Sequence, residues 1–263
     1  MAKTEKEPVT GVGVLLNDVM DVFGAYNGVS HVWIEHAPLH IVGTHAIHKQ
    51  LQIRGYPKTD YPEIAGLCCL GSLKYLKSIV SRLITQRGFK VDLQFREIDE
   101  QPTLFKAVFA TGRTEIPYQA KDPTVLPAGV KRPGPEKNVA WPIKFPIPPD
   151  VIEEMRDFTA VQGASDYKTE RIFFQVEKNK AKLILGSRDQ VGGFMLTDDA
   201  GTDQSWKAEL RFDEFLTAMN RGAKTGVNMC AGPFGVRIEF ETAVSLWAVT
   251  LAAKKDPNAQ VSR

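Results

Sequence analysis

The chain has 263 residues, of which 43% are hydrophobic and 24% charged, and its formal net charge is +2. These values are ordinary for a globular protein with enough apolar residues for two cores, and they lack the strongly basic composition of many nucleic-acid-binding domains. No apolar run approaches the roughly 20 residues of a membrane span, and the polar N-terminus contains no secretory signal. Three cysteines, two of them adjacent, do not make a disulfide framework and favour the cytosol.

In chain order, the first half begins with a helical pattern that Asn27-Gly28 ends. Its apolar positions recur with helical spacing at Leu15, Leu16, Val19, Met20, Phe23 and Tyr26. Strand-like runs follow, and Ser72 can cap a second helix over Leu73–Gln86. The predicted strands are His31–Glu35, Leu39–Thr44, Gln50–Arg54, Ala65–Leu70, Val91–Glu97, Leu104–Thr111 and Thr114–Tyr118.

A proline-rich stretch follows, in which nine of the 16 prolines fall between Pro117 and Pro149. Because proline fixes φ and removes a backbone donor, this stretch cannot be a helix interior or a central strand. We expect an extended connector of limited flexibility, with about 115 residues on either side, a common domain size. The sequence therefore predicts an N-terminal domain at residues 1–120, a connector at 121–148 and a C-terminal domain at 149–263.

The second half repeats the order of the first. Asp150 lies three residues before Glu153, which is a capping-box spacing, so a helix begins there. A second helix is expected over Phe212–Arg221. The predicted strands are Arg171–Val176, Lys182–Leu185, Gly193–Leu196, Trp206–Leu210, Val227–Cys230, Gly235–Glu241 and Val244–Ala252. The fold class is therefore α+β, a duplicated domain with two helices and antiparallel strands in each copy.

The helix Leu73–Gln86 has an unusual polar face. Its apolar face consists of Leu73, Leu76, Ile79, Val80 and Leu83. The opposite face consists of Lys74, Lys77, Ser78, Ser81, Arg82 and Thr85. A face with three cations and no carboxylate suits phosphate oxygens, which Lys and Arg contact without reading sequence. The alternative is a plain solvated helix face.

The other helices offer fewer cations. Arg221 and Lys224 end the helix Phe212–Arg221, where cations also complement the helix dipole. Arg156 lies among acidic residues of the helix that begins at Asp150. The first helix should expose Asn17, Asp18 and Asp21, which do not favour phosphate.

No catalytic constellation is evident. All five histidines lie at His31, His36, His40, His45 and His48. Their spacing matches no familiar ligand pattern, and strand alternation would send them to different faces, so a metal site is an alternative without further support. The sequence contains no dinucleotide fingerprint, phosphate-binding P-loop, G-x-S-x-G or H-E-x-x-H motif. This favours a binding or scaffold protein without a cofactor.

With the repeat, the connector and the basic helix, the chain resembles the DNA polymerase sliding clamps of T-even-like tailed bacteriophages. The resemblance is most specific in Ile116–Leu126, an aromatic–Ala–Asp–Pro segment that enters the connector, and in Pro142–Pro148, a Pro-Phe-Pro exit from it. Weaker and less specific similarity is found in Leu15–Asn17, in the hairpin Val176–Lys180 and in Phe212–Asn220. The chain departs from the family in its slightly basic charge and in a longer connector that contains Lys131-Arg132.

The resemblance implies the DNA clamp fold and a closed homotrimeric ring, in which helices line a hole around double-stranded DNA. It implies a non-enzymatic processivity factor that tethers the replicative DNA polymerase, is loaded by a clamp loader, and also couples to late transcription in T-even relatives. The resemblance also implies that the protein acts in the cytoplasm of the infected bacterial host. The alternatives are a two-domain β-rich virion structural protein and a metal-dependent enzyme that uses the histidine cluster.

The resemblance also assigns candidate site residues. The residues expected to face DNA are Lys74, Lys77, Arg82, Arg221, Lys224 and, more weakly, Arg156. Partners of clamps dock short apolar peptides beside the connector. Val125, Leu126 and Trp141 are unusually apolar for a linker and are the candidates for that contact. The alternative is that they only hold the connector against a domain.

Overall fold

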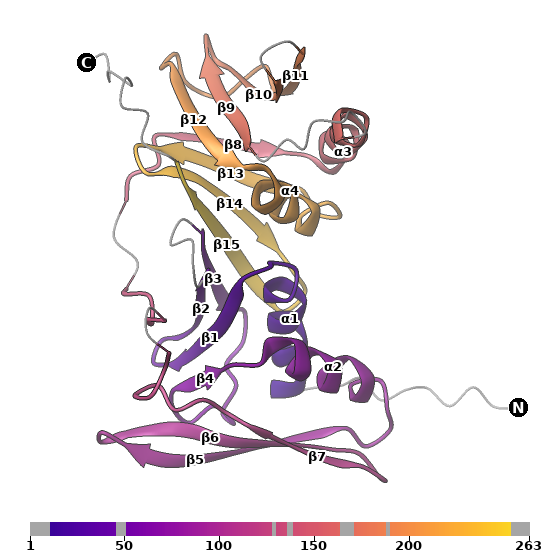
Figure 1. Cartoon of the computed structure of the whole chain (residues 1–263), viewed down its shortest axis with the longest axis vertical. Coiled ribbons are helices and arrows are strands. Elements are labelled where there is room, and N and C mark those ends of the chain that lie inside the picture. Colours follow the sequence, from indigo (N-terminus) through magenta and orange to yellow (C-terminus); the bar gives the residue numbers. More distant parts are fainter. Residues whose placement is uncertain are drawn as a thin grey trace, which may run out of the picture. The chain divides into compact units, whose positions relative to one another are not determined.

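The computed structural model describes residues 11–45, 51–127, 130–135, 139–163, 171–187 and 190–253 (Figure 1). The chain divides into two compact units. Unit 1 is Met1–Gly134 together with Thr242–Trp247, and unit 2 is Pro135–Glu241 together with Ala248–Arg263. The first part of the connector therefore belongs to unit 1. None of the helices among the described residues is long and apolar enough to span a membrane.

The described residues of unit 1 form two helices and two antiparallel sheets (Figure 1). One sheet has the order β4-β1-β2-β3, with the first residues of β15 next to β3, and the other has the order β5-β6-β7. The elements are α1 (Val12–Phe23), β1 (Val29–His36), β2 (Leu39–His45), β3 (Leu51–Pro57), β4 (Cys68–Leu70), α2 (Leu73–Leu83), β5 (Lys90–Ile98), β6 (Gln101–Ala110) and β7 (Glu115–Gln119).

The core of unit 1 forms where α1 and α2 pack together against strands of both sheets. All six apolar residues that define the periodicity of the first predicted helix are buried. The helix itself ends at Phe23, before the predicted stop, and Tyr26 is buried in the turn that follows. The five apolar residues of α2 are buried as well, so the predicted apolar faces of both helices are confirmed.

Asp18 is buried, although the helical periodicity predicts it on the exposed face of α1. Its relative exposure is only 9%. Its Oδ2 accepts hydrogen bonds from Trp247 Nε1 at 3.0 Å and from Thr242 Oγ1 at 3.1 Å. Both donors come from the C-terminal segment that completes unit 1. The helix periodicity cannot reveal this burial, because the strand that covers Asp18 lies 229 residues further along the chain.

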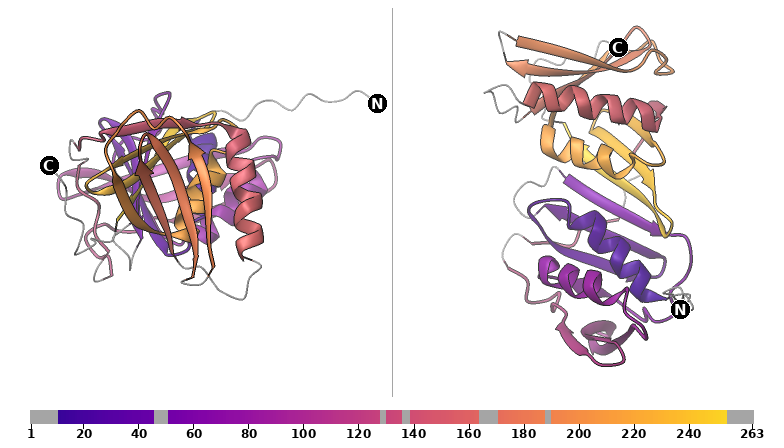
Figure 2. Two further views of the ribbon diagram at one scale, coloured as in Figure 1. Left: turned by 90° about the horizontal axis from the view of Figure 1, so that it is seen from above. Right: turned by 90° about the vertical axis from the view of Figure 1, so that its right-hand side faces the viewer.

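Unit 2 has the same kinds of elements, with antiparallel sheets in the orders β11-β10-β9-β12 and β8-β13-β14, the latter continued by the last residues of β15. Helices α3 and α4 lie side by side (Figure 2). The elements are β8 (Ile143–Ile147), α3 (Pro149–Gly163), β9 (Arg171–Glu177), β10 (Lys180–Ser187), β11 (Gln190–Thr197), β12 (Trp206–Arg211), α4 (Phe212–Arg221), β13 (Val227–Gly232), β14 (Gly235–Glu241) and β15 (Ser245–Ala252).

The observed elements confirm the predicted α+β class with two helices in each half. The proline-rich stretch differs from the expected connector at its end, because Ile143–Ile147 forms strand β8 and pairs with β13. This is compatible with Pro146 because β8 is the end strand of its sheet in the described part of the chain, and an edge strand tolerates a residue without an N–H donor. Pro117 lies in β7, which is likewise at the edge of its sheet.

Candidate nucleic-acid interface and connector groove

Helix α2 carries the cationic face expected from the sequence. Lys74 and Arg82 are exposed, and Lys77 is partly exposed. Ser72 is the residue before the helix, but it has a left-handed φ of 48° and its side chain makes no capping bond. The helix begins instead with the Ser72 carbonyl, which accepts hydrogen bonds from the amides of Tyr75 and Leu76. The exposed side chains of Lys74 and Arg82 are open to solvent or to a ligand.

The cationic face is bordered by one carboxylate from α1. Lys77 Nζ lies 3.9 Å from Asp21 Oδ1, and both side chains are substantially exposed. An exposed pair at this distance contributes little to stability and is screened by salt. Lys77 therefore keeps most of its capacity to attract a phosphate.

The cations of unit 2 occupy two helices. Arg221 is the last residue of α4 and Lys224 follows in the next turn, and both are exposed. Arg156 is exposed on α3, with the acidic residues Glu153 and Asp157 also exposed on the same helix. This arrangement gives α4 a cationic end and gives α3 a mixed surface.

A groove of about 640 Å³ lies in unit 1 where the connector begins. Two candidates for partner binding and one candidate for DNA binding line it together: Val125, Leu126 and Lys74. The groove is lined by Val29–His31 of β1, Ser72–Tyr75 at the start of α2, and Lys121, Asp122 and Val125–Pro127 of the connector. Sequence reasoning assigned these residues to separate surfaces, and the structure brings them into one.

The charge of this groove is mainly positive. Lys74 and Lys121 are exposed. Burial lowers the pKa of His31, and the nearby Lys121 adds to this effect, so the imidazole is neutral at neutral pH. Asp122 is already engaged, because it binds Arg96 at 3.0 Å and accepts hydrogen bonds from Thr124. These Thr124 hydrogen bonds, with Arg96, hold the pKa of the Asp122 carboxyl below its usual range.

The two connector candidates have different surroundings. Leu126 is half-buried and packs against a cluster that contains Trp33, Val42 and Cys69. Val125, the preceding residue, is 77% exposed. Leu126 therefore holds the connector to unit 1, while Val125 presents an apolar side chain to the groove.

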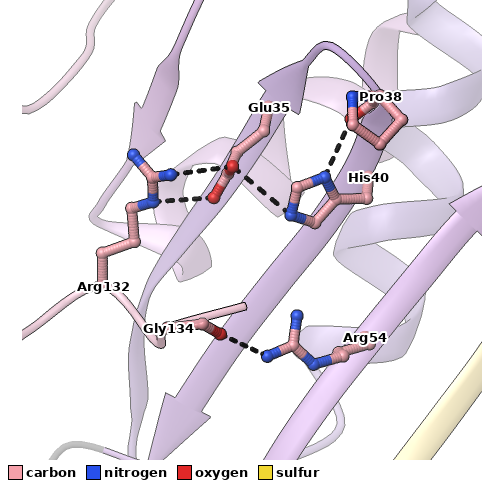
Figure 3. Close-up of polar contacts among 6 residues, drawn as sticks. All are labelled: Glu35, Pro38, His40, Arg54, Arg132 and Gly134. Atoms are coloured by element: carbon pink, nitrogen blue, oxygen red, sulfur yellow. Dashed lines mark hydrogen bonds and ion pairs between the residues drawn. The ribbon is translucent and has the colours of Figure 1, made fainter. Parts of the chain in front are cut away.

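Further along, the connector is tied to the sheet by two arginines (Figure 3). Arg132 makes a two-pronged ion pair with Glu35, at 2.7 Å and 2.8 Å, and His40 Nε2 lies 3.4 Å from the same carboxylate. Arg54 donates a hydrogen bond of 2.6 Å to the carbonyl of Gly134. The cationic piece that lengthens the connector thus has a structural role in fixing its path.

Trp141 belongs to unit 2 and is half-buried. It lies against Gly232, where an added Cβ would be 3.4 Å from the indole ring. The turn that follows β13 exposes Phe234 to 63%. Trp141 therefore packs beside the end of β13, two residues before the exposed Phe234, a neighbourhood that the sequence did not indicate.

Four of the five histidines lie on two neighbouring strands. His31 and His36 lie on β1, and His40 and His45 lie on β2, whereas His48 lies outside the described residues. Within the described ranges, no three His, Cys, Asp or Glu side chains come close enough together to hold a metal ion.

Sequence reasoning missed two residues of the groove, Tyr75 and Lys121. Tyr75 is 53% exposed on α2, and the aliphatic part of Lys121 lies over Gly71, where an added Cβ would be 2.6 Å from Lys121 Cγ. Tyr75 could have been identified from the sequence, because it is an aromatic residue outside the apolar stripe of its helix. No local sequence feature distinguishes Lys121.

No family model and no curated protein matches the sequence. Solved structures do match. The chain is similar to PCNA in the complex of A. fulgidus PCNA with the C-terminal region of FEN-1, with a TM-score of 0.63, 14% identity, and coverage of 93% of this chain and 96% of the other. The chain has the PCNA-like clamp fold.

Two further structures extend the comparison. Proliferating Cellular Nuclear Antigen from Entamoeba histolytica matches with a TM-score of 0.61, 12% identity, and coverage of 92% and 96% of the two chains. A chain of the PCNA2–PCNA3 complex from Sulfolobus tokodaii matches with a TM-score of 0.57, 12% identity, and coverage of 94% and 98%. The clamp fold therefore accounts for both units and for nearly the full length of each chain.

Proposed function

We propose that this chain is a sliding clamp, one subunit of a closed homotrimeric ring that encircles duplex DNA and tethers the replicative DNA polymerase. The observation that carries the proposal is the acid-free cationic face of α2 on a PCNA-like clamp fold. Long cations attract phosphates without reading bases, so a ring lined by them holds a duplex and still slides along it. The clamp itself has no catalytic role, and a clamp loader opens and closes it.

Lys77 and Arg82 of α2, with Arg221 and Lys224 of unit 2, are the residues we assign to the DNA-facing surface. Lys74 is the third α2 candidate and also lines the connector groove. Arg156 is a weaker candidate because its helix exposes Glu153 and Asp157. We assign Val125, Leu126 and Trp141 to partner binding, with Leu126 both lining the groove and packing against the cluster around Trp33.

Free sheet edges support self-assembly. Strand β7 ends one sheet of unit 1 and β11 ends one sheet of unit 2, so each has a row of backbone groups without a neighbouring strand in the described chain. Near β11 two large apolar side chains are exposed, Met195 to 47% and Val161 of α3 to 72%. We propose that β7 of one copy pairs with β11 of the next, with a gap in the ladder at Pro117, which has no N–H donor. Such a head-to-tail contact forms a closed ring where its rotation closes, and the proposed ring has three copies.

The similarity to T-even-like phage clamps, in the segments that enter and leave the connector, supports an origin in such a phage. It also supports action in the cytoplasm of the infected bacterium and a second role in late transcription. The complex of A. fulgidus PCNA with a FEN-1 segment is a precedent for peptide docking on this fold.

The proposal is tested by reversing the charge of the α2 face. The variant carries Lys74→Glu, Lys77→Glu and Arg82→Glu, and its matched control carries Lys90→Glu, Lys106→Glu and Lys180→Glu, which lie on strands. We expect the α2 variant to lose stimulation of the polymerase on primed circular DNA and to keep the mass of three chains, about 88 kDa from 29.2 kDa each. The control should stimulate normally.

Two results would contradict the proposal. A wild-type chain that remains a monomer at every concentration in light scattering cannot form the ring. If the α2 variant stimulates the polymerase as well as the control does, the assignment of the α2 cations to the DNA-facing surface is wrong.

A further inference from the structure

We propose that the turn between β4 and α2 binds a phosphate dianion, either free or as the terminal group of a nucleotide. The site consists of the first backbone amides of α2 and the side chains of Ser72, His31, Lys74 and Lys121, all of which line the groove described above. This inference goes beyond the proposed function and does not depend on it, because every residue of the site belongs to unit 1.

The first donors of the site are backbone amides at the start of α2. The first four amides of a helix have no acceptor inside it. The amides of Tyr75 and Leu76 donate to the Ser72 carbonyl. Those of Leu73 and Lys74 have no acceptor within the described ranges, and the exposed Ser72 hydroxyl makes no capping bond. The helix dipole adds to this, so the start of α2 attracts an anion.

A buried histidine points independently to a ligand at the same place. His31 is only 8% exposed, and it lines the groove. Its Nδ1 lies 2.9 Å from Ser30 Oγ, whereas its Nε2 has no hydrogen-bond partner in the part of the chain that the structure describes. When the Ser30 hydroxyl donates to Nδ1, the proton of the neutral imidazole is on Nε2. An oxygen of an anion in the groove would satisfy this donor, which is costly to leave unpaired.

The absence of a side chain at Gly71 brings a cation to the same point. A Cβ added at Gly71 would lie 2.6 Å from Cγ and 2.9 Å from Cε of Lys121, and 3.3 Å from His31 Nε2. The ammonium group of Lys121 is one bond beyond Cε, so it lies near His31 Nε2 and beside the peptide that leads into α2. The backbone amides, the imidazole and the ammonium group therefore converge on one small region of the groove.

The turn is held in place before any ligand binds. The Tyr118 hydroxyl, which is buried, donates to the Gly71 carbonyl at 2.7 Å and accepts a hydrogen bond from the Gly71 amide at 2.9 Å. The amide of Lys121 donates to the Cys69 carbonyl at 2.9 Å, which fixes the backbone of the connector next to β4. Donors that are already in position lower the entropy lost on binding.

The charges of the groove favour a phosphate dianion over the phosphodiester of a DNA backbone. Lys74 and Lys121 are exposed, and no ion pair joins either to a carboxylate within the described ranges. The carboxylate of the lining, Asp122, is bound by Arg96 and Thr124. A phosphomonoester has three terminal oxygens and nearly two negative charges, whereas a phosphodiester has two free oxygens and one charge. The monoester therefore matches the two cations and occupies more of the donors.

The experiment titrates inorganic phosphate and thymidine 5′-monophosphate into the full chain by isothermal titration calorimetry. The solution is kept above neutral pH, where both ligands are mainly dianions, and at constant ionic strength. Dimethyl phosphate, a monoanion with two free oxygens, is the control ligand. We expect saturable binding of phosphate and of the nucleotide, and binding of dimethyl phosphate that is at least tenfold weaker, the effect of about one lost charge-assisted contact.

Three variants test the assigned side chains. Lys121→Gln removes a cation and should weaken binding of both phosphates by tenfold or more. His31→Phe keeps a ring but removes the Nε2 donor, and should weaken binding about fivefold, the effect of one neutral hydrogen bond. Lys90→Gln, at an exposed lysine on β5 outside the groove, is the matched control and should bind as the wild type does. Circular dichroism and light scattering should give each variant the Tm and mass of the control.

The wild-type imidazole gives a readout that a merely structural role would not change. Burial, and then the charge of Lys121, hold the pKa of His31 below its usual value. A dianion bound between the two residues opposes the charge of Lys121. The pKa of His31, followed by NMR, should therefore rise when phosphate is added and stay unchanged when dimethyl phosphate is added at the same ionic strength.

The source of the phosphate is distinguished by comparing the two ligands. Tyr75 is 53% exposed and lines the same groove, so a base could stack on its ring. If thymidine monophosphate binds more tightly than phosphate and Tyr75→Ala removes the difference, the ligand is a nucleotide. Equal affinities of the two indicate free phosphate.

Four results would overturn the proposal. The first is the absence of saturable phosphate binding, and the second is equal phosphate binding by Lys121→Gln and Lys90→Gln. The third is a pKa of His31 that phosphate does not change. The fourth is a Lys121→Gln variant that binds duplex DNA more weakly but phosphate normally, because the groove would then be part of the DNA-facing surface.

Discussion

Asp18 should make the stability of unit 1 depend on pH. Burial raises the pKa of its carboxyl, and the hydrogen bonds from Trp247 and Thr242 offset only part of this. Because the folded pKa is above the unfolded one, the folded state binds the proton more tightly. The resulting stability is fully present below the ordinary pKa of 3.8 and is lost as the pH rises through the raised value.

Two substitutions separate the charge from the hydrogen bonds. Asp18→Asn keeps an oxygen that can accept from both Trp247 Nε1 and Thr242 Oγ1, since both donate to the same atom of Asp18. We expect it to be at least as stable as the wild type at neutral pH and to lack this pH dependence. Asp18→Ala leaves a buried indole N–H without an acceptor, which costs about 1–3 kcal/mol.

The assay is thermal unfolding followed by circular dichroism across the acidic and neutral range. For a chain of this size about 1 kcal/mol corresponds to roughly 2–4 °C, so Asp18→Ala should lower Tm by about 2–12 °C. Asp21→Asn, on the exposed part of the same helix, is the control and should change little. The reasoning is refuted if Asp18→Ala melts with the wild type, or if Asp18→Asn keeps the wild-type pH dependence.

Three further predictions concern unit 1. The hydroxyl of Tyr118 donates to the carbonyl of Gly71 and accepts from its amide, so Tyr118→Phe should cost about 1–3 kcal/mol in urea unfolding, and an unchanged midpoint would contradict this. Glu35→Gln removes the ion pair with Arg132, so trypsin should cleave after Lys131 faster than in the wild type, with Tm nearly unchanged; equal cleavage rates would show that the pair does not hold the connector. Burial raises the pKa of Cys68 to about 12, so iodoacetamide should label it at pH 8 only after unfolding, as mass spectrometry can show, and rapid labelling of the native chain would disprove its burial.

The sequence was sufficient for the elements whose pattern is local. In α2 the apolar positions recur every three or four residues, and those residues are the buried ones. The polar face was predictable for the same reason, because an α-helix places alternate stripes on opposite sides. The sequence predicted an extended connector up to residue 148 because prolines such as Pro146 exclude a central strand. They do not exclude the edge strand that β8 forms.

The candidate site depended more on the tertiary structure. Lys74 and Val125 are 51 positions apart, and nothing in either segment indicates that they line one groove. The neighbours are set by the hydrogen bond from the Lys121 amide to the Cys69 carbonyl, which lays the connector beside the start of α2. A sequence pattern reports which face of an element is apolar, but not which element will cover it.

By itself the sequence determined the two-fold repeat of helices and strands, the apolar stripes and the acid-free face of α2, because backbone geometry fixes how side chains alternate along one element. The tertiary structure alone decided that Asp18 is buried beneath Trp247 and that Tyr75, Lys121 and Val125 share a groove. These outcomes depend on packing between segments far apart in the chain, whose free energy comes from apolar surface that each segment can bury only against another.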